Sequence, residues 1–345
     1  MKDIFANEPR TPLIFAPTPL HPAANLSADM GIDLWLKRDD LTGPGVFGGN
    51  KMRKLEFLLG EARVMGADHV ITYGATQSNH AMQTAAACAL MGLRCVLYLV
   101  ALVPPDGKAP RGNMLLDELF GAETHIIGLA PGETEGDGLE KGYAMAAEYI
   151  KKLEAEGHRC LNVPMGGASK TGSLGFASGY LEMREQLVAA GGAPFDSIYF
   201  ATGSAGTLAG ILAGRAIAGG GEEIRAICSG IKGVDYESSA ITLANEVLSH
   251  LGRDERVGAG DFSVDRAYVG PGYEVPYAES TAALKRMARR EGVTLDPVYS
   301  GKAFAALVDH AETGRIKPGG KVLFWCTGGA ASLFAEPEIV GDFAD

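Results

Sequence analysis

Short apolar runs alternate along the chain with longer segments whose apolar residues recur at helical spacing. The segments "HVITYG", "NHAMQTAAACALMG" and "RCVLYLV", between residues 69 and 100, predict a strand, a helix and a strand. The segments "SIYFATG", "AGTLAGILAGRAIAG" and "IRAICSG", between residues 197 and 230, repeat that order. Because these strands are apolar at nearly every position, we expect parallel sheets that helices cover on both faces. The pattern predicts an α/β protein with two similar units.

The composition is that of a globular protein and narrows the classes of partner. With 345 residues, of which 46% are hydrophobic and 21% charged, the chain is long enough for two domains. Its formal charge of −11 disfavours nucleic acids and anionic membranes, so we expect neither as a partner. The five cysteines lack C-x-x-C spacing, which predicts reduced thiols and no metal site. The chain shows no signal peptide and no long apolar span, so we expect a cytoplasmic location.

The loop after the first predicted strand carries polar side chains to a helix start. In "TYGATQSNHAMQ", a buried strand delivers Ser78 and Asn79 to the beginning of the helix. These side chains suit either a crevice that binds a ligand or capping of the helix, which is worth about 1 kcal/mol. The loop alone leaves both interpretations open.

The corresponding loop of the second unit is rich in glycine and hydroxyl groups. In "ATGSAGTLAG", a strand is joined to a helix by Thr202, Gly203, Ser204, Ala205, Gly206 and Thr207. Free backbone amides and a helix N-terminus together can hold a phosphate group. The spacing matches neither G-x-x-x-x-G-K-[ST] nor G-x-G-x-x-G, which favours a small phosphorylated cofactor over a nucleoside triphosphate or a dinucleotide. An ordinary glycine-rich turn is the alternative.

Lys51 follows two glycines and an asparagine in "GGNKMRKLEF", where an apolar helical pattern begins. A helix N-terminus disfavours positive charge and so lowers the pKa of an amine placed there. A lysine that forms a Schiff base needs a lowered pKa. A rigid turn, such an amine and a separate phosphate loop are the parts that a pyridoxal phosphate enzyme requires, whereas a solvated lysine is the alternative.

Motifs along nearly the whole chain resemble the D-cysteine desulfhydrase and aminocyclopropane-carboxylate deaminase family. They are "GGNKMRKLEF", "GATQSNHAMQTAA", "GNMLLDELFGAE", "ATGSAGTLAG", "VGPGY", "LDPVYSGKA" and "CTGG". The resemblance implies a pyridoxal 5'-phosphate enzyme of fold type II, with two parallel-sheet three-layer domains of the tryptophan synthase β-like kind. It implies a small domain of residues 51–164 inserted into a large domain of residues 1–50 plus 165–345. It also implies a homodimer that acts on a small amino acid.

The resemblance assigns roles around the cofactor residue by residue. Lys51 resembles the Schiff-base lysine, and Lys54 in "KMRK" resembles a charge near the phosphate. Asn79 in "QSNH" is expected to bond the 3'-oxygen, and Thr327 in "CTGG" to contact the pyridine nitrogen. The loop from Thr202 to Thr207 is expected to bind the phosphate.

The same motifs assign residues to the substrate side. Ser78 is expected to meet the substrate carboxylate or move a proton, with Asn79 and His80 beside it. Tyr273 in "GPGY" and Tyr299 in "PVYSGK" resemble the tyrosines that line this side, although core packing is the alternative for each tyrosine taken alone.

Two departures from the family pattern bear on the reaction. Aminocyclopropane-carboxylate deaminases typically carry Glu where this chain has Ser300, so a hydroxyl is expected beside the pyridine nitrogen, as on the desulfhydrase side. Met82 stands where the family usually has Arg, which leaves the substrate open. The resemblance implies β-elimination from D-cysteine to pyruvate, hydrogen sulfide and ammonia. The alternatives are an aminocyclopropane-carboxylate deaminase, a lyase for cysteate or another β-substituted alanine, and a non-catalytic ligand sensor.

Overall fold

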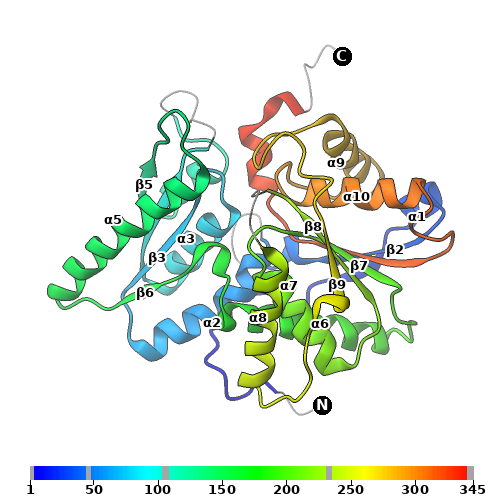
Figure 1. Cartoon of the computed structure of the whole chain (residues 1–345), viewed down its shortest axis with the longest axis horizontal. Helices are drawn as coiled ribbons and strands as arrows, with labels where there is room; N and C mark the ends of the chain where they lie inside the picture. The colour runs from blue at the N-terminus through cyan, green and yellow to red at the C-terminus, as the bar shows by residue number, and fades with distance from the viewer. Residues whose placement is uncertain (1–3, 44–47, 103–108, 231–234, 340–345) are drawn as a thin grey trace.

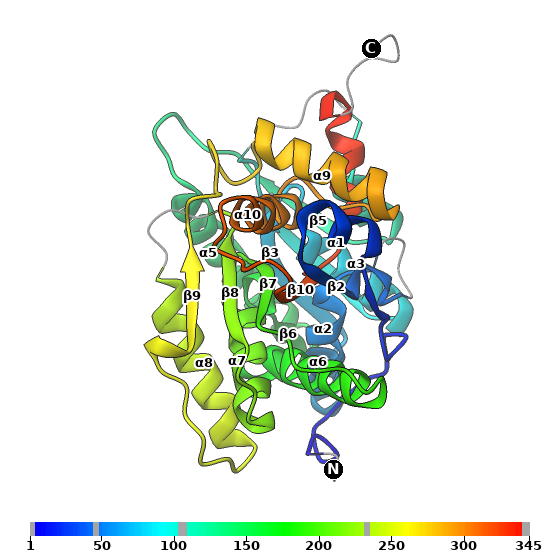
Figure 2. The same ribbon diagram turned by 90° about the vertical axis from the view of Figure 1, so that its right-hand side faces the viewer.

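The chain folds around two β-sheets that lie side by side, with helices on both faces of each (Figure 1). The structure is a computed structural model that describes residues 4–43, 48–102, 109–230 and 235–339. The larger sheet has the strand order β1-β2-β10-β7-β8-β9, which Figure 2 shows from β9 across to β2. Only β1 pairs antiparallel, and the other pairs are parallel. The strands are β1 (Leu20–Pro22), β2 (Asp33–Arg38), β7 (Ser197–Thr202), β8 (Glu223–Cys228), β9 (Phe262–Asp265) and β10 (Lys321–Cys326).

Alternate side chains of the larger sheet enter two separate cores. In β10, Leu323 and Trp325 pack with one set of helices, and Phe324 packs with the other. The first set is α6 (Lys170–Ala189), α7 (Gly206–Ala218) and α8 (Tyr236–His250). The second set is α1 (Ala24–Met30), α9 (Ala278–Glu291) and α10 (Ser300–Glu312). Because both faces are covered, the strands are apolar on both sides, as predicted.

The smaller sheet is wholly parallel and has the order β5-β4-β3-β6. Its strands are β3 (His69–Ala75), β4 (Arg94–Val100), β5 (Glu123–Ile127) and β6 (Cys160–Asn162). Helix α3 (Asn79–Met91) packs on one face and α5 (Glu135–Ala155) on the other, and α4 (Asn113–Leu119) packs against α3. The predicted α/β class with two three-layer units is confirmed.

Helix α2 (Asn50–Met65) joins the two halves, because it packs against α6 of the larger half and α3 of the smaller (Figure 1). All strands of the smaller sheet fall within residues 51–164 and all strands of the larger sheet outside them. The domain boundaries themselves stay a prediction. Short 3-10 turns complete the fold at η1 (Asp39–Leu41), η2 (Met165–Gly167), η3 (Ala259–Asp261), η4 (Ala330–Ala335) and η5 (Pro337–Ile339).

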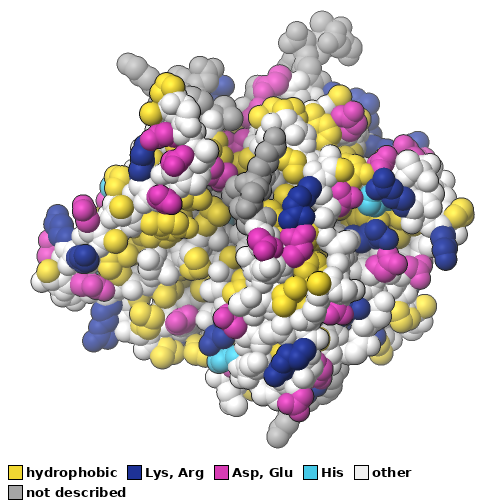
Figure 3. Space-filling view, in the orientation of Figure 1, with side chains coloured by type: hydrophobic (Ala, Val, Ile, Leu, Met, Phe, Trp, Pro, Cys, Tyr) yellow, Lys and Arg dark blue, Asp and Glu magenta, His cyan; other side chains and the backbone are white. Residues whose placement is uncertain are grey.

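The charges on the surface and the character of the helices are relevant to nucleic acids and membranes, the partners that the sequence disfavours. On the face shown in Figure 3, lysine and arginine side chains are interspersed with aspartate and glutamate. Among the described residues, no helix combines the length and the apolar character that a membrane span needs.

Candidate active site

Two cavities that share Lys51, Gly203, Ser204 and Tyr299 lie between the larger and the smaller half. Parallel strands place the loops that follow them at one edge of a sheet, and α/β proteins bind ligands there. The first cavity is further lined by Asn50, Asn79, Ala201, Thr202, Ala205, Thr207 and Thr327. The second is further lined by Gly74, Ala75, Ser78, His80, Glu135, Met165, Gly166 and Tyr273. Of the predicted site residues, Lys54, Gly206 and Ser300 are absent from these walls, and Lys54 lies behind them, against Gly166 and Gly206.

The loop between β7 and α7 has the geometry of an anion cradle. Ala205 has φ of 61°, and among the described residues it is the one non-glycine residue with a positive φ. Such a backbone costs about 1 kcal/mol or more and is typical of functional sites. A Cβ atom on Gly206 would lie 2.9 Å from Ala168 Cα, and a Cβ on Gly203 3.1 Å from Tyr299 Cε1. The buried Thr202 Oγ1 has no hydrogen-bond partner among the described residues, so this loop offers a donor and backbone amides to an anion.

Lys51 lies in the first turn of α2, and this turn is held from another helix. Gln83 Oε1 of α3 accepts hydrogen bonds from the backbone N–H groups of Lys51 and Met52, both at 3.1 Å. A Cβ on Gly49 would lie 2.3 Å from Gln83 Nε2, so a larger residue there would displace the Gln83 amide that holds this turn. Burial lowers the pKa of Lys51 to about 8, although the charge of Asp296 opposes this shift. The sequence predicted a lowered pKa from the helix N-terminus, and the structure supplies burial as the cause.

Lys54 lies one turn further along α2, behind the cradle. Its Nζ donates to Gly166 O at 3.0 Å and would lie 3.0 Å from a Cβ on Gly206. Burial, followed by the charge of Lys51, lowers the pKa of Lys54 well below its ordinary value. A bound phosphate would favour the charged form of this amine, so Lys54 suits a role as a partner of an anion.

Ser78 caps its helix, as one interpretation of the sequence predicted, and both Ser78 and Asn79 also line cavities. Ser78 Oγ caps α3 by accepting from Ala81 N at 3.2 Å, and Ser78 also lines the second cavity. Asn79 Oδ1 accepts from Asn113 Nδ2 at 2.8 Å, which fixes the orientation of the Asn79 amide. The sequence reasoning missed Asn113, although it lies in the quoted "GNMLLDELFGAE" motif.

The hydrogen bonds of His80 determine its tautomer. Thr72 Oγ1 donates its only proton to Val163 O at 2.9 Å, so His80 Nε2 has to donate to Thr72 Oγ1, at 2.8 Å. His80 Nδ1 therefore carries a lone pair, and it has no partner among the described residues. Burial, then the charges of Lys51 and Lys54, lower the pKa of His80 well below its ordinary value. His80 is accordingly a neutral acceptor in the cavity wall.

The two predicted tyrosines meet at the second cavity, from the loop before α9 and the start of α10. Their hydroxyl groups are hydrogen-bonded to each other, and the rings are T-shaped with centroids 5.5 Å apart. Burial, and then the nearby Glu135, raise the pKa of Tyr299, so its phenol keeps its proton. Glu135 was missed by the sequence reasoning. It begins α5, lines the second cavity, and burial raises the pKa of its carboxyl to about 7.

Ser300 has a partner that the sequence did not predict. Its Oγ donates to Asp296 Oδ1 at 2.5 Å, and the backbone N–H of Asp296 donates to the same Oγ at 2.8 Å. Asp296 is fully buried, and burial raises its pKa despite the hydrogen bonds it accepts from Ser300, Tyr299 and Val298. Thr327, by contrast, lines the first cavity. The predicted contact of Ser300 with the pyridine nitrogen stays a prediction. Because Ser300 Oγ already donates its proton to Asp296, it could only accept a hydrogen bond in such a contact.

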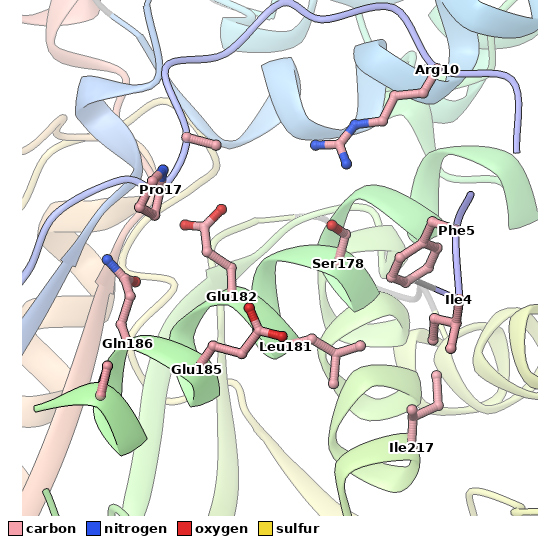
Figure 4. A pocket seen from close by; sticks show the side chains of 12 residues that line it. Ile4, Phe5, Arg10, Pro17, Ser178, Leu181, Glu182, Glu185, Gln186 and Ile217 are labelled. Carbon is pink, nitrogen blue, oxygen red and sulfur yellow. The ribbon is translucent and has the colours of Figure 1, made fainter. Parts of the chain in front are cut away.

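A separate groove lies on the outer side of α6 and contains none of the predicted site residues (Figure 4). Ile4, Phe5 and Pro17 line it from the N-terminal segment, and Leu181 and Glu182 line it from α6. Glu182 also accepts a hydrogen bond from the buried Arg53 of α2 at 2.9 Å. The groove is therefore lined by Glu182, a residue that also holds α2 through Arg53.

Comparison with known proteins agrees with this geometry. The family model described as "Pyridoxal-phosphate dependent enzyme" matches residues 12–328. The chain is 38% identical to the D-cysteine desulfhydrase of Yersinia enterocolitica over 332 residues, which cover 96% of each chain. It is 38% identical to the D-cysteine desulfhydrase of Klebsiella pneumoniae over 329 residues, 95% of this chain and 96% of the relative. A crystal structure of an ACC deaminase homologue matches with a TM-score of 0.84 and 36% identity, over 98% of this chain and 97% of that one.

The residues present fit the cofactor of that family. The unpartnered Thr202 Oγ1, the cradle at Gly203 and Gly206, and an amine of lowered pKa at Lys51 are the features that a phosphate and an aldehyde require. The chain belongs to the pyridoxal-phosphate-dependent enzymes and is of fold type II.

Proposed function

We propose that this enzyme is a β-elimination lyase that converts D-cysteine and water into pyruvate, hydrogen sulfide and ammonia. The observation that carries the proposal is the identity of 38% to D-cysteine desulfhydrases over 96% of the chain, together with a hydroxyl side chain at position 300. The reaction removes the Cα proton, breaks the Cβ–S bond with departure of hydrosulfide, and hydrolyses the remaining enamine. Bound pyridoxal phosphate supplies the electron sink for the Cα carbanion.

The chain's own groups suit the proton transfers. Lys51, with a pKa of about 8, holds a usable share of neutral amine near neutral pH and is assigned to take the Cα proton. Ser78 Oγ is assigned to the substrate carboxylate or to the same proton. The phenol of Tyr299, which its raised pKa keeps protonated, and the phenol of Tyr273 hydrogen-bonded to it are assigned to protonate the leaving sulfur. Gly74 makes room for Ser78, because a Cβ there would lie 2.5 Å from Ser78 Oγ.

The test measures products from purified holoenzyme. We expect pyruvate and sulfide in equal amounts from D-cysteine and no 2-oxobutanoate from aminocyclopropane-carboxylate. L-cysteine and both enantiomers of cysteate complete the panel. Pyruvate from cysteate alone, with sulfite as the second product, would move the assignment to a cysteate lyase.

Aminocyclopropane-carboxylate deamination is the second candidate, because the similar crystal structure is an ACC deaminase homologue. Efficient 2-oxobutanoate production with no pyruvate from D-cysteine would establish it and would overturn the argument from Ser300. Ser300→Glu places a carboxylate beside Asp296, where two acids compete for one site. We therefore expect this substitution to lower D-cysteine turnover without creating deaminase activity, which the same two assays measure.

We further propose that the enzyme is a homodimer, as the family resemblance implies, and that it is cytoplasmic, as expected from a sequence without a signal-peptide pattern or a long apolar span. Sedimentation of the purified protein at several concentrations measures the oligomeric state. A mass of one chain, 36.1 kDa, at micromolar concentration would contradict the dimer.

A further inference from the structure

Asp68, His69 and His158 form a cluster at the end of the smaller sheet away from the cofactor. Asp68 directly precedes β3 and His69 begins it, and His158 lies two residues before β6, the neighbouring strand in Figure 1. One ligand-type atom from each residue lies within 4.8 Å of the others. The sequence predicted no metal site, because these residues are separated by about 90 positions and match no spacing motif.

The two imidazoles converge on one carboxylate. Asp68 Oδ1 lies 2.8 Å from His69 Nδ1, and Asp68 Oδ2 lies 2.8 Å from His158 Nδ1. The rings are T-shaped, with centroids 4.6 Å apart. The Nδ1 atoms of both rings therefore point at the carboxylate of Asp68. A cation beside this carboxylate can bind the lone pairs of both Nδ1 atoms when each neutral ring carries its proton on Nε2.

The backbone holds the two segments in fixed register. Arg159 O accepts from Asp68 N at 3.0 Å and from His69 N at 3.2 Å, and Arg159 N donates to Asp68 Oδ1 at 3.0 Å. Arg159 also has a cationic side chain, but its guanidinium donates to Met65 O at 3.1 Å instead of pairing with Asp68. Ligands that are already ordered reduce the entropy lost on binding.

Burial is graded across the cluster. The side chain of His69 is 6% exposed, that of His158 is 39% exposed, and that of Asp68 is 51% exposed. One side of the cluster thus rests on protein, and the other side is open to water molecules that complete the coordination of an ion.

We propose that Asp68, His69 and His158 bind a divalent transition-metal ion, with Zn²⁺ as the best match. Two imidazoles and a carboxylate suit Zn²⁺ and Ni²⁺, whereas Mg²⁺ and Ca²⁺ prefer all-oxygen sites. Zn²⁺ accepts three protein ligands and a water molecule. The ion joins the starts of β3 and β6. From the rise per residue of a strand, this place is about 20 Å from the carboxyl end of β3. The role of the ion is therefore to hold the two strands together at the end of the small sheet that lies away from the cofactor.

The test is calorimetric titration of chelator-treated, metal-free holoenzyme with Zn²⁺ at pH 7.5. We expect one ion per chain with a dissociation constant in the micromolar range or tighter, and a higher melting temperature when zinc is present. His158→Ala should weaken binding at least tenfold and abolish the gain in melting temperature. Titration with Co²⁺ should give visible d–d bands in the wild type that the variant lacks.

The control is His125→Ala, because His125 Nε2 makes an imidazole–carboxylate contact of the same length, 2.8 Å, with Glu123. That pair belongs to no three-ligand group among the described residues. We expect the His125 variant to bind zinc as the wild type does. Two results would overturn the proposal: no saturable zinc binding by the wild type, or the same binding isotherm for the wild type and His158→Ala. Either result would show that Asp68 only bridges two imidazole N–H groups. Circular dichroism of each variant verifies that it is folded.

Discussion

Lys51 illustrates how the surroundings of one residue set its chemistry. An ordinary lysine is almost entirely protonated at neutral pH, but burial lowers the pKa of this amine to about 8. Lys54 and His80 are buried as well, and burial lowers the pKa of both side chains. The cavity thus collects three nitrogen groups whose charged forms are disfavoured by burial until an anion binds.

Lys51→Ala should abolish turnover, by roughly 10³-fold or more, and remove the cofactor absorbance near 420 nm. The fold should persist, because Gln83 holds the first turn of α2 through backbone N–H groups that the substitution leaves in place. Product assays, absorbance spectra and circular dichroism measure these effects. Lys141→Ala, at an exposed salt bridge, is the matched control. Wild-type turnover in the Lys51 variant would refute the assignment.

Gly203→Val and Gly206→Val should each weaken cofactor binding at least tenfold. A β-branched side chain at either position collides with Tyr299 or Ala168 and covers the amides of the cradle. Equilibrium dialysis with pyridoxal phosphate measures the dissociation constants. Gly221→Val, where a Cβ meets nothing within 4 Å, should bind the cofactor as the wild type does. Unchanged affinity in both cradle variants would place the phosphate elsewhere.

At the scale of elements, α2 is held in place by a buried ionic network. The Arg53 guanidinium bonds Asp39 of η1 at 2.7 and 2.8 Å and Glu182 of α6 at 2.9 and 3.1 Å. Burial alone would raise the pKa of Glu182, but the hydrogen bonds and charges of Arg53 and Lys37 hold it at about 2. Gly175 lets α6 approach α2, because a Cβ there would lie 2.1 Å from Arg53 O. The position of Lys51 therefore depends on contacts far behind it.

Arg53→Met should destabilise the protein by about 3–5 kcal/mol, because it leaves the fully buried Asp39 without its cation and removes one of the two cations that pair with Glu182. Urea unfolding monitored by circular dichroism measures the loss. The matched control is Arg266→Met, which breaks an exposed pair with Glu237 and should cost less than about 1 kcal/mol. An equal, small loss in both variants would mean that the network does not hold α2.

At the scale of the whole molecule, the buried acids differ in how their charge is compensated. Asp39 pairs with the Arg53 guanidinium and Asp296 accepts hydrogen bonds from Ser300, Tyr299 and Val298, whereas Asp117 of α4 is fully buried without such partners in the described part of the chain. Neither carboxylate oxygen of Asp117 has a hydrogen-bond partner among the described residues. Burial, then the charge of Glu118, raise the pKa of Asp117 to about 8. This acid therefore makes the stability of the protein depend on pH.

Asp117→Asn should stabilise the protein by about 5 kcal/mol at pH 9 and have little effect at pH 4. The folded state holds the proton up to a pKa of about 8 and the unfolded state only to 3.8, so the wild type loses stability as pH rises through this window. The variant has no such proton to lose. Melting temperatures of both proteins between pH 4 and pH 9 measure the difference. A pH-independent difference would show that Asp117 has a partner in the folded protein.

The sequence by itself determined the units of the fold and the residues of the candidate site. Apolar strands and turn residues are local signals, so the units around "HVITYG" and "SIYFATG" formed where predicted, as β3-α3-β4 and β7-α7-β8. Of the predicted site residues, all but Lys54, Gly206 and Ser300 line the two cavities, and Ser78, Asn79 and the loop that begins at Thr202 follow the ends of β3 and β7.

Only the tertiary structure decided how these residues behave and which others join them. The tautomer of His80, the Asp296 partner of Ser300 and the place of Glu135 in the cavity depend on segments that are distant in sequence or on hydrogen-bond geometry. The same holds for Asp68 and His158, which adjacent parallel strands bring together from about 90 positions apart. Burial and distance arise only when the chain is packed, so residue types and their spacing could not reveal them.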